Sequence, residues 1–133
     1  MHLHAFRLQP GQDLKQEIQA FARQEKIEAG WIITCVGSLT DYHLRFADHP
    51  NGKRGKGHYE IVSLVGTVSL HGSHIHMSIS DELGQTIGGH LLDENLVYTT
   101  AEIVIGSSDE LVFTREDDET TGYRELQIRK KAK

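Results

Sequence analysis

Three histidines in this chain have a spacing that suits metal chemistry. His74 and His76 flank a single residue, and His90 follows a pair of glycines. Side chains alternate faces along a strand, so His74 and His76 share one face while Ile75 and Met77 point to the other. Neutral imidazoles are common ligands for zinc and for other borderline divalent metals. The pattern therefore predicts a site for a divalent transition metal, with zinc as the leading candidate.

The segment between these histidines predicts how they meet. Residues 81–85 have the composition of a tight turn, and Gly84 suits its left-handed position. A hairpin closed by this turn pairs His76 directly with His90, with Cβ atoms about 4.5–5.5 Å apart. A register shifted by one residue would turn His90 to the opposite face. We therefore expect His74, His76 and His90 on one face, and the alternative is a hydrogen-bonded polar patch without metal.

A site with three protein ligands leaves one position of a tetrahedral ion open to water or substrate. Gly88 and Gly89 precede the third histidine, and we expect them to let a ligand or a neighbouring subunit approach the backbone. A β-bulge is the alternative interpretation of this glycine pair. The other histidines share no spacing and are interpreted as surface or hydrogen-bonded residues: His2, His4, His43, His49, His58 and His71.

The elements that position these residues are a helix and a series of strands. Asp13 is predicted to cap the helix, with Gln16 completing a capping-box pattern, and the apolar residues that follow have helical spacing. Beyond Trp31 the pattern becomes that of strands. The predicted strands are residues 31–36, 42–47, 59–70, 73–80, 86–92, 97–105, 111–114 and 125–129. One helix followed by strands predicts an α+β fold: a mostly antiparallel, curved or barrel-like sheet with one main helix packed against it.

Length and composition bound the remaining possibilities. A chain of 133 residues has the size of one domain, so residues 1–133 are expected to form a single domain. No segment approaches the ~20 apolar residues of a membrane helix, and the start lacks the apolar core of a signal peptide. We therefore expect a cytoplasmic protein with no membrane partner. The lone Cys35 lies in an apolar run and is predicted to be buried without a chemical role.

The charge balance bears on nucleic-acid binding. The formal net charge is −5 with neutral histidines, which supplies no general attraction to phosphate backbones. Lys53, Arg54 and Lys56 lie in a Gly-rich segment that is interpreted as a solvated loop. They are the residues that would contact phosphates if the chain bound DNA, an alternative function that the net charge disfavours.

Motifs along almost the whole chain also carry a family resemblance. They are residues 30–32, 36–39, 44–45, 57–64, 66–67, 74–78, 80–81 with Gly84, 88–91 and 99–102. Together they resemble the PPC domain, a family conserved in plants and prokaryotes and found in plants next to AT-hooks. The resemblance implies an α+β domain that forms a homotrimer with a small-molecule pocket near the subunit boundary. It implies a metal site at His74, His76 and His90, and it makes Arg45 and Glu60 candidate pocket residues.

Three functions follow from these observations. The first is a metal-binding PPC domain that acts on or senses a small molecule, with Glu60 or Asp81 as candidates to move a proton. The second is a DNA-binding or chromosome-associated protein, although this chain has no AT-hook and carries histidines that the plant domains generally lack. The third is a cupin-like metal oxygenase, which fits poorly because the second cupin motif is missing. The residues identify no substrate and do not decide whether the chain is an enzyme.

Overall fold

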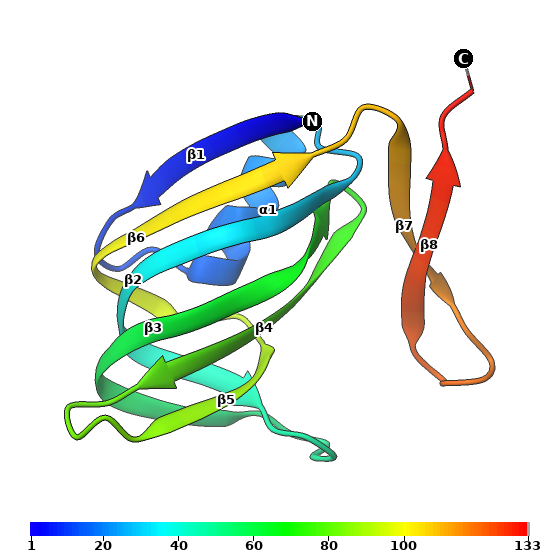
Figure 1. Ribbon diagram of the computed structural model, residues 1–133. Coiled ribbons are helices and arrows are strands. Elements are labelled where there is room, and N and C mark those ends of the chain that lie inside the picture. The colour runs from blue at the N-terminus through cyan, green and yellow to red at the C-terminus, as the bar shows by residue number, and fades with distance from the viewer. Residues whose placement is uncertain (133) are drawn as a thin grey trace.

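The computed structural model describes residues 1–132, which form a curved antiparallel sheet, one helix and a separate hairpin (Figure 1). The elements in chain order are β1 (His2–Leu8), α1 (Leu14–Gln24), β2 (Gly30–Arg45), β3 (Lys53–Ser69), β4 (Gly72–Ser80), β5 (Thr86–Leu91), β6 (Leu96–Ser107), β7 (Leu111–Asp117) and β8 (Arg124–Lys130). The predicted α+β class is confirmed. Among the described residues, no helix has both the length and the apolar character of a membrane-spanning segment.

The main sheet has the strand order β1-β6-β2-β3-β4-β5, and it curls until β5 also pairs with the end of β2. This second pairing joins Leu44 to Leu91 and Arg45 to His90. Irregular register along β2, for example between Gly37 and Ser38, marks the bulges that bend the strand. The sheet is therefore curved, as predicted, and Figure 1 shows the strands wrapping around one side of α1.

The helix begins where the sequence predicts. The Asp13 carboxylate accepts a hydrogen bond from the backbone N–H of Gln16 at 3.2 Å, which satisfies one of the unpaired donors of the first turn. Leu14, Ile18 and Ala22 on its apolar face are fully buried and join the core formed by the inward side chains of the sheet. This packing places α1 on the face of the sheet opposite the exposed histidines of β4.

Two predictions about strand boundaries are wrong. The segments 31–36 and 42–47 were predicted as separate strands, but residues 31–36 and 42–45 belong to the single strand β2, and residues 46–47 follow it. The basic segment predicted as a loop is the start of β3. Both errors come from glycines that were interpreted as turn signals. In the structure, these glycines allow a neighbouring backbone or an aromatic ring to lie close to the strand. A Cβ at Gly37 would lie 2.1 Å from the Thr100 carbonyl oxygen, and one at Gly55 would lie 2.2 Å from the ring of Tyr42.

The hairpin of β7 and β8 is tied to the end of the sheet by hydrogen bonds. The Phe113 N–H donates to the Glu28 carbonyl at 2.8 Å, and the buried Ser69 hydroxyl donates to the Phe113 carbonyl at 3.0 Å. The Arg115 guanidinium donates to the Thr67 hydroxyl at 2.8 Å. These contacts fix the hairpin beside β3 and β4, where it stands apart from the sheet in Figure 1.

Candidate metal centre

The pairing of β4 with β5 brings the three histidines together. His76 is the direct cross-strand partner of His90, as the turn chemistry predicts. The Asp81 N–H donates to the Gln85 carbonyl at 3.0 Å, and Gly84 has a φ of 78°, the left-handed conformation expected for it. The predicted register is therefore confirmed.

The geometry of the cluster suits a single ion. One ligand atom from each of His74, His76 and His90 lies within 4.8 Å of the other two. The ring centroids are 4.9 Å apart for His74 and His76, 5.2 Å for His74 and His90, and 5.7 Å for His76 and His90. A tetrahedral zinc ion requires about 3.3 Å between nitrogens. The imidazoles would have to move closer together to bind zinc, and their chemistry and common face make them a candidate site for a transition metal.

The ring nitrogens of this cluster have no hydrogen-bond partner among residues 1–132. In the described part of the chain, none of the three imidazoles forms a hydrogen bond, whereas His4 bonds the Ser107 hydroxyl at 2.9 Å and His43 bonds the Asp93 carbonyl at 2.9 Å. His74 and His76 are exposed and His90 is half-buried. The cluster is thus accessible and has unused lone pairs.

Burial and neighbouring charges favour the neutral form of two imidazoles of the cluster, those of His74 and His90. Partial burial, followed by the positive charge of Arg45, lowers the pKa of His90 to about 4. Burial also lowers the pKa of His74, with further contributions from His76 and Arg115. A metal requires the neutral imidazole. At neutral pH, His74 and His90 therefore need lose no proton before they coordinate an ion.

A row of cross-strand partners surrounds the cluster. Val65 pairs with His76, His76 with His90, and His90 with Arg45, so the row crosses four strands. Gly89 allows β5 to pair with the end of β2, because a Cβ at this position would lie 2.6 Å from the Arg45 carbonyl oxygen. The glycine pair was predicted to admit a ligand or a subunit, whereas within this chain Gly89 admits the backbone of β2.

The histidines line a hollow of about 810 Å³. Its wall includes the predicted pocket residue Arg45, residues 46–50 after β2, and Tyr123 of the hairpin loop. A second hollow of about 330 Å³ continues from it, since Arg45, His74 and His90 line both. The second hollow is bounded by hairpin residues: Arg115, Tyr123, Arg124 and Glu125.

The structure does not bring the other predicted site residues to the histidines. Glu60 pairs with Ser80, which lies four residues from His76 along β4, or about 13 Å in an extended strand. Glu60 and Asp81 instead line a separate hollow of about 230 Å³. The Asp81 carboxylate holds the turn by accepting hydrogen bonds from the N–H groups of Leu83 and Gln85, each at 2.9 Å. Within this chain, neither residue is placed to move a proton at the histidine cluster.

Sequence reasoning missed the arginines of the hairpin. Arg115 lies just beyond a predicted strand, and Arg124 lies just before another. No sequence pattern links either residue to the histidines. Their place in the pocket depends on how the hairpin docks, which no local pattern encodes. Cys35, by contrast, is buried as predicted, and burial together with Glu102 raises the pKa of its thiol to about 12.

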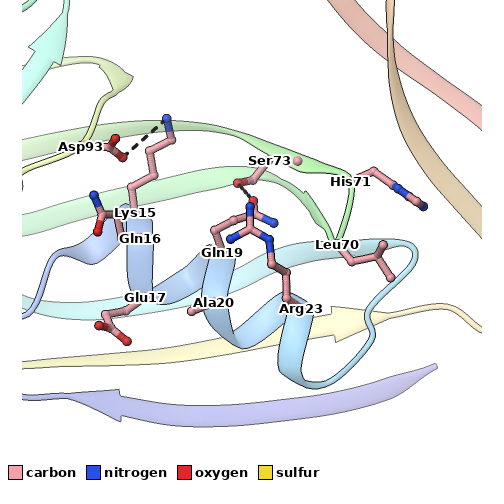
Figure 2. A pocket seen from close by; sticks show the side chains of 11 residues that line it. Lys15, Gln16, Glu17, Gln19, Ala20, Arg23, Leu70, His71, Ser73 and Asp93 are labelled. Atoms are coloured by element: carbon pink, nitrogen blue, oxygen red, sulfur yellow. Dashed lines mark hydrogen bonds and ion pairs between the residues drawn. The ribbon is translucent and has the colours of Figure 1, made fainter.

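A further hollow of about 630 Å³ lies between α1 and the start of β4 (Figure 2). Two pairs of its polar side chains interact. The Lys15 ammonium lies 3.9 Å from the Asp93 carboxylate, and the Ser73 hydroxyl donates to the Gln19 side-chain oxygen at 2.7 Å.

A curved antiparallel sheet backed by one helix, with three facing histidines on its exposed side, defines an α+β domain with a candidate metal centre. The chain belongs to the Plants and Prokaryotes Conserved (PCC) domain family, whose model matches residues 1–109. The resemblance to the PPC domain is therefore confirmed, and the cupin-like alternative finds no support in it. The hairpin of β7 and β8 lies outside the matched residues.

Curated relatives contain this domain within longer proteins. The chain is 45% identical over 132 residues to the bifunctional protein GlmU of Synechococcus sp. (strain JA-3-3Ab), covering 99% of this chain and 21% of that protein. It is 29% identical over 112 residues to AT-hook motif nuclear-localized protein 14 of Arabidopsis thaliana, covering 78% of this chain and 26% of that protein. The chain thus spans about a quarter or less of the length of these relatives.

Solved structures share the fold over nearly the whole chain. A hypothetical protein from Salmonella enterica superposes with a TM-score of 0.96 at 40% identity, covering 98% of this chain and 95% of that one. The metal-containing protein AF0104 from Archaeoglobus fulgidus superposes with a TM-score of 0.78 at 27% identity, covering 96% and 94%.

Proposed function

We propose that this PCC-domain protein binds a divalent transition metal, foremost zinc, through His74, His76 and His90, and that the metal centre receives a small molecule. The observation that carries this proposal is the convergence of three accessible imidazoles, with ligand atoms within 4.8 Å of one another and no hydrogen-bond partner in the described chain. The similarity to a protein described as metal-containing supports it.

The chain's own residues would shape the reaction or binding event. A bound zinc ion would polarise an oxygen of the ligand or lower the pKa of a bound water. Arg45 would hold a positive charge beside His90, because the two residues are cross-strand partners. The hollow of about 810 Å³ is large enough for a metabolite-sized ligand, whose orientation the residues after β2 would restrict.

We further propose that the chain assembles as a homotrimer through the exposed face of β2 and β3. Four apolar side chains project from this face, with exposed fractions of 46–57%: Ile33, Val36, Val62 and Val65. A cluster of this kind on adjacent strands is typical of an interface. Because Val65 is the cross-strand partner of His76, a subunit seated there would lie beside the metal centre.

Elemental analysis of protein purified without chelators tests the metal centre. We expect about one metal ion per chain in the wild-type protein and strong loss of metal in H76A and in H90A, because two imidazoles hold zinc far more weakly than three. H71A is the matched control, since His71 is exposed and lies outside the cluster. Unchanged metal content in both cluster variants, in correctly folded protein, would refute the assignment.

DNA binding is the second candidate function, and the AT-hook motif of the Arabidopsis thaliana relative is what favours it. The basic residues at the start of β3 are partly neutralised, since Arg54 pairs with Glu94, and Lys56 lies 3.7 Å from Asp41. Binding through them would weaken steeply with salt. A gel-shift titration at low salt tests this function, and absence of a shifted band would count against it.

A further inference from the structure

Two arginines flank the histidine cluster from opposite sides. Arg45 on β2 is the cross-strand partner of His90. Arg115 on the hairpin donates to the Thr67 hydroxyl at 2.8 Å, and Thr67 is the cross-strand partner of His74. Both arginines line the hollow of about 330 Å³ that opens onto the cluster.

In the described part of the chain, neither guanidinium has its charge neutralised by an ion pair. Among residues 1–132, no carboxylate lies within 4.0 Å of Arg45 or Arg115, whereas Arg124 has Asp117 at 4.0 Å. Glu125 is the one acidic residue that lines the smaller hollow, against three arginines. The hollow is therefore cationic in a chain whose formal net charge is −5.

Partial burial removes water from the Arg115 guanidinium, which favours its interaction with an anionic ligand. Burial lowers the pKa of Arg115, because part of its hydration is lost, yet an arginine side chain stays protonated. An anion seated against it would replace the missing hydration with charge-assisted hydrogen bonds. The planar guanidinium fork matches the oxygens of a carboxylate or a phosphoryl group.

We propose that Arg45 and Arg115 form an anion-binding site beside the histidine cluster, so that the small molecule received there carries a carboxylate or phosphoryl group. The proposal deepens the proposed function and rests on it for the metal that the ligand would meet. Because Arg115 belongs to the hairpin, which lies beyond residues 1–109 of the family match, the hairpin would contribute to the charge preference of the pocket.

Calorimetric titration of the zinc-loaded 133-residue chain with oxalate and with inorganic phosphate tests the site. We expect binding of at least one of these anions, weakened about tenfold or more in R115Q and in R45Q, because each loses charge-assisted hydrogen bonds. The tighter of the two anions identifies the ligand class as carboxylate or phosphoryl. R129Q is the matched control, since Arg129 is an exposed residue of the same hairpin that lines neither hollow.

Metal content measured on each sample separates this proposal from the metal centre. If the protein holds zinc but neither anion binds, the anion site is refuted and the metal centre stands. If no zinc binds, yet an anion still binds the metal-free protein and is lost in R115Q and R45Q, the anion site stands alone. If R129Q weakens anion binding as much as R115Q and R45Q do, the effect comes from the overall charge of the chain, and the site is refuted. R45Q keeps the test decisive if R115Q detaches the hairpin.

Discussion

His76 lies directly opposite His90 on the neighbouring strand, with the two ring centroids 5.7 Å apart. This relationship depends on β5 fitting between β4 and the end of β2, and Gly89 is the point of closest approach. The position of His90 in the candidate metal centre therefore depends on the close packing of Gly89 against β2.

The first prediction concerns that glycine. In G89A the new methyl group would meet the Arg45 carbonyl oxygen at 2.6 Å, so β2 and β5 must separate. We expect a loss of about 1–3 kcal/mol in the free energy of unfolding, together with weaker metal binding. Urea denaturation and metal analysis measure both effects. T86A, at an exposed position on the same strand, should change neither, and a G89A protein as stable as wild type would contradict the packing argument.

The second prediction concerns the stability of the metal-free protein in acid. The pKa of His90 is lowered to about 4 in the fold from an ordinary value of 6.5. The unfolded state therefore binds more protons between these values, and stability falls as the pH drops from about 6.5 to about 4. His90 is partly exposed and therefore screened by solvent. We expect its ionisation to account for a loss on the order of 1 kcal/mol in the free energy of unfolding over this pH range.

Denaturation curves of metal-free wild type, H90N and H71N across this pH range measure the contribution of His90 to the pH dependence of stability. The wild-type curve should fall more steeply with acid than that of H90N, because asparagine cannot titrate. H71N should follow the wild type. Parallel pH profiles for H90N and wild type would show that His90 ionises in the fold as it does in the unfolded chain.

The third prediction concerns assembly. Val65 is 57% exposed in the single chain, so V65D should be tolerated by the fold itself. If three copies meet over this face, the buried aspartate would be unpaired and the assembly would dissociate. Light scattering after size-exclusion chromatography should then give the trimer mass for wild type and the monomer mass for V65D. I128D, which places the same charge at an exposed apolar position of the hairpin, should leave the mass unchanged.

Local patterns were sufficient to predict the convergence of the three histidines and the helix cap. Alternation along β4 assigns the faces of His74 and His76, and the turn around Gly84 fixes the partner of His76. Asp13 caps α1 through a hydrogen bond to a residue three positions away, so its signal also lies within one turn. In each case the interaction that decides the structure is encoded by residues close together in the chain.

Features that local patterns did not predict have the opposite origin. Gly37 resembles a break between strands, but its role is set by the Thr100 backbone, which is distant in sequence. Glu60 is a pocket candidate from a family resemblance, and within this chain the register of β3 with β4 places it beside Ser80. Arg115 reaches the hollow only because the hairpin docks on Thr67. Such placements follow from tertiary contacts that spacing alone does not encode.

The row that crosses four strands changes in character from one end to the other. It begins with the apolar Val65, continues through the imidazoles of His76 and His90, and ends with the cationic Arg45. In the proposed trimer the neighbouring subunit would cover the Val65 end, so a molecule bound at the cluster would have an apolar wall on one side and the charged Arg45 on the other, in an order fixed by the strand order of the sheet. The two unlike sides would give the bound molecule one preferred orientation.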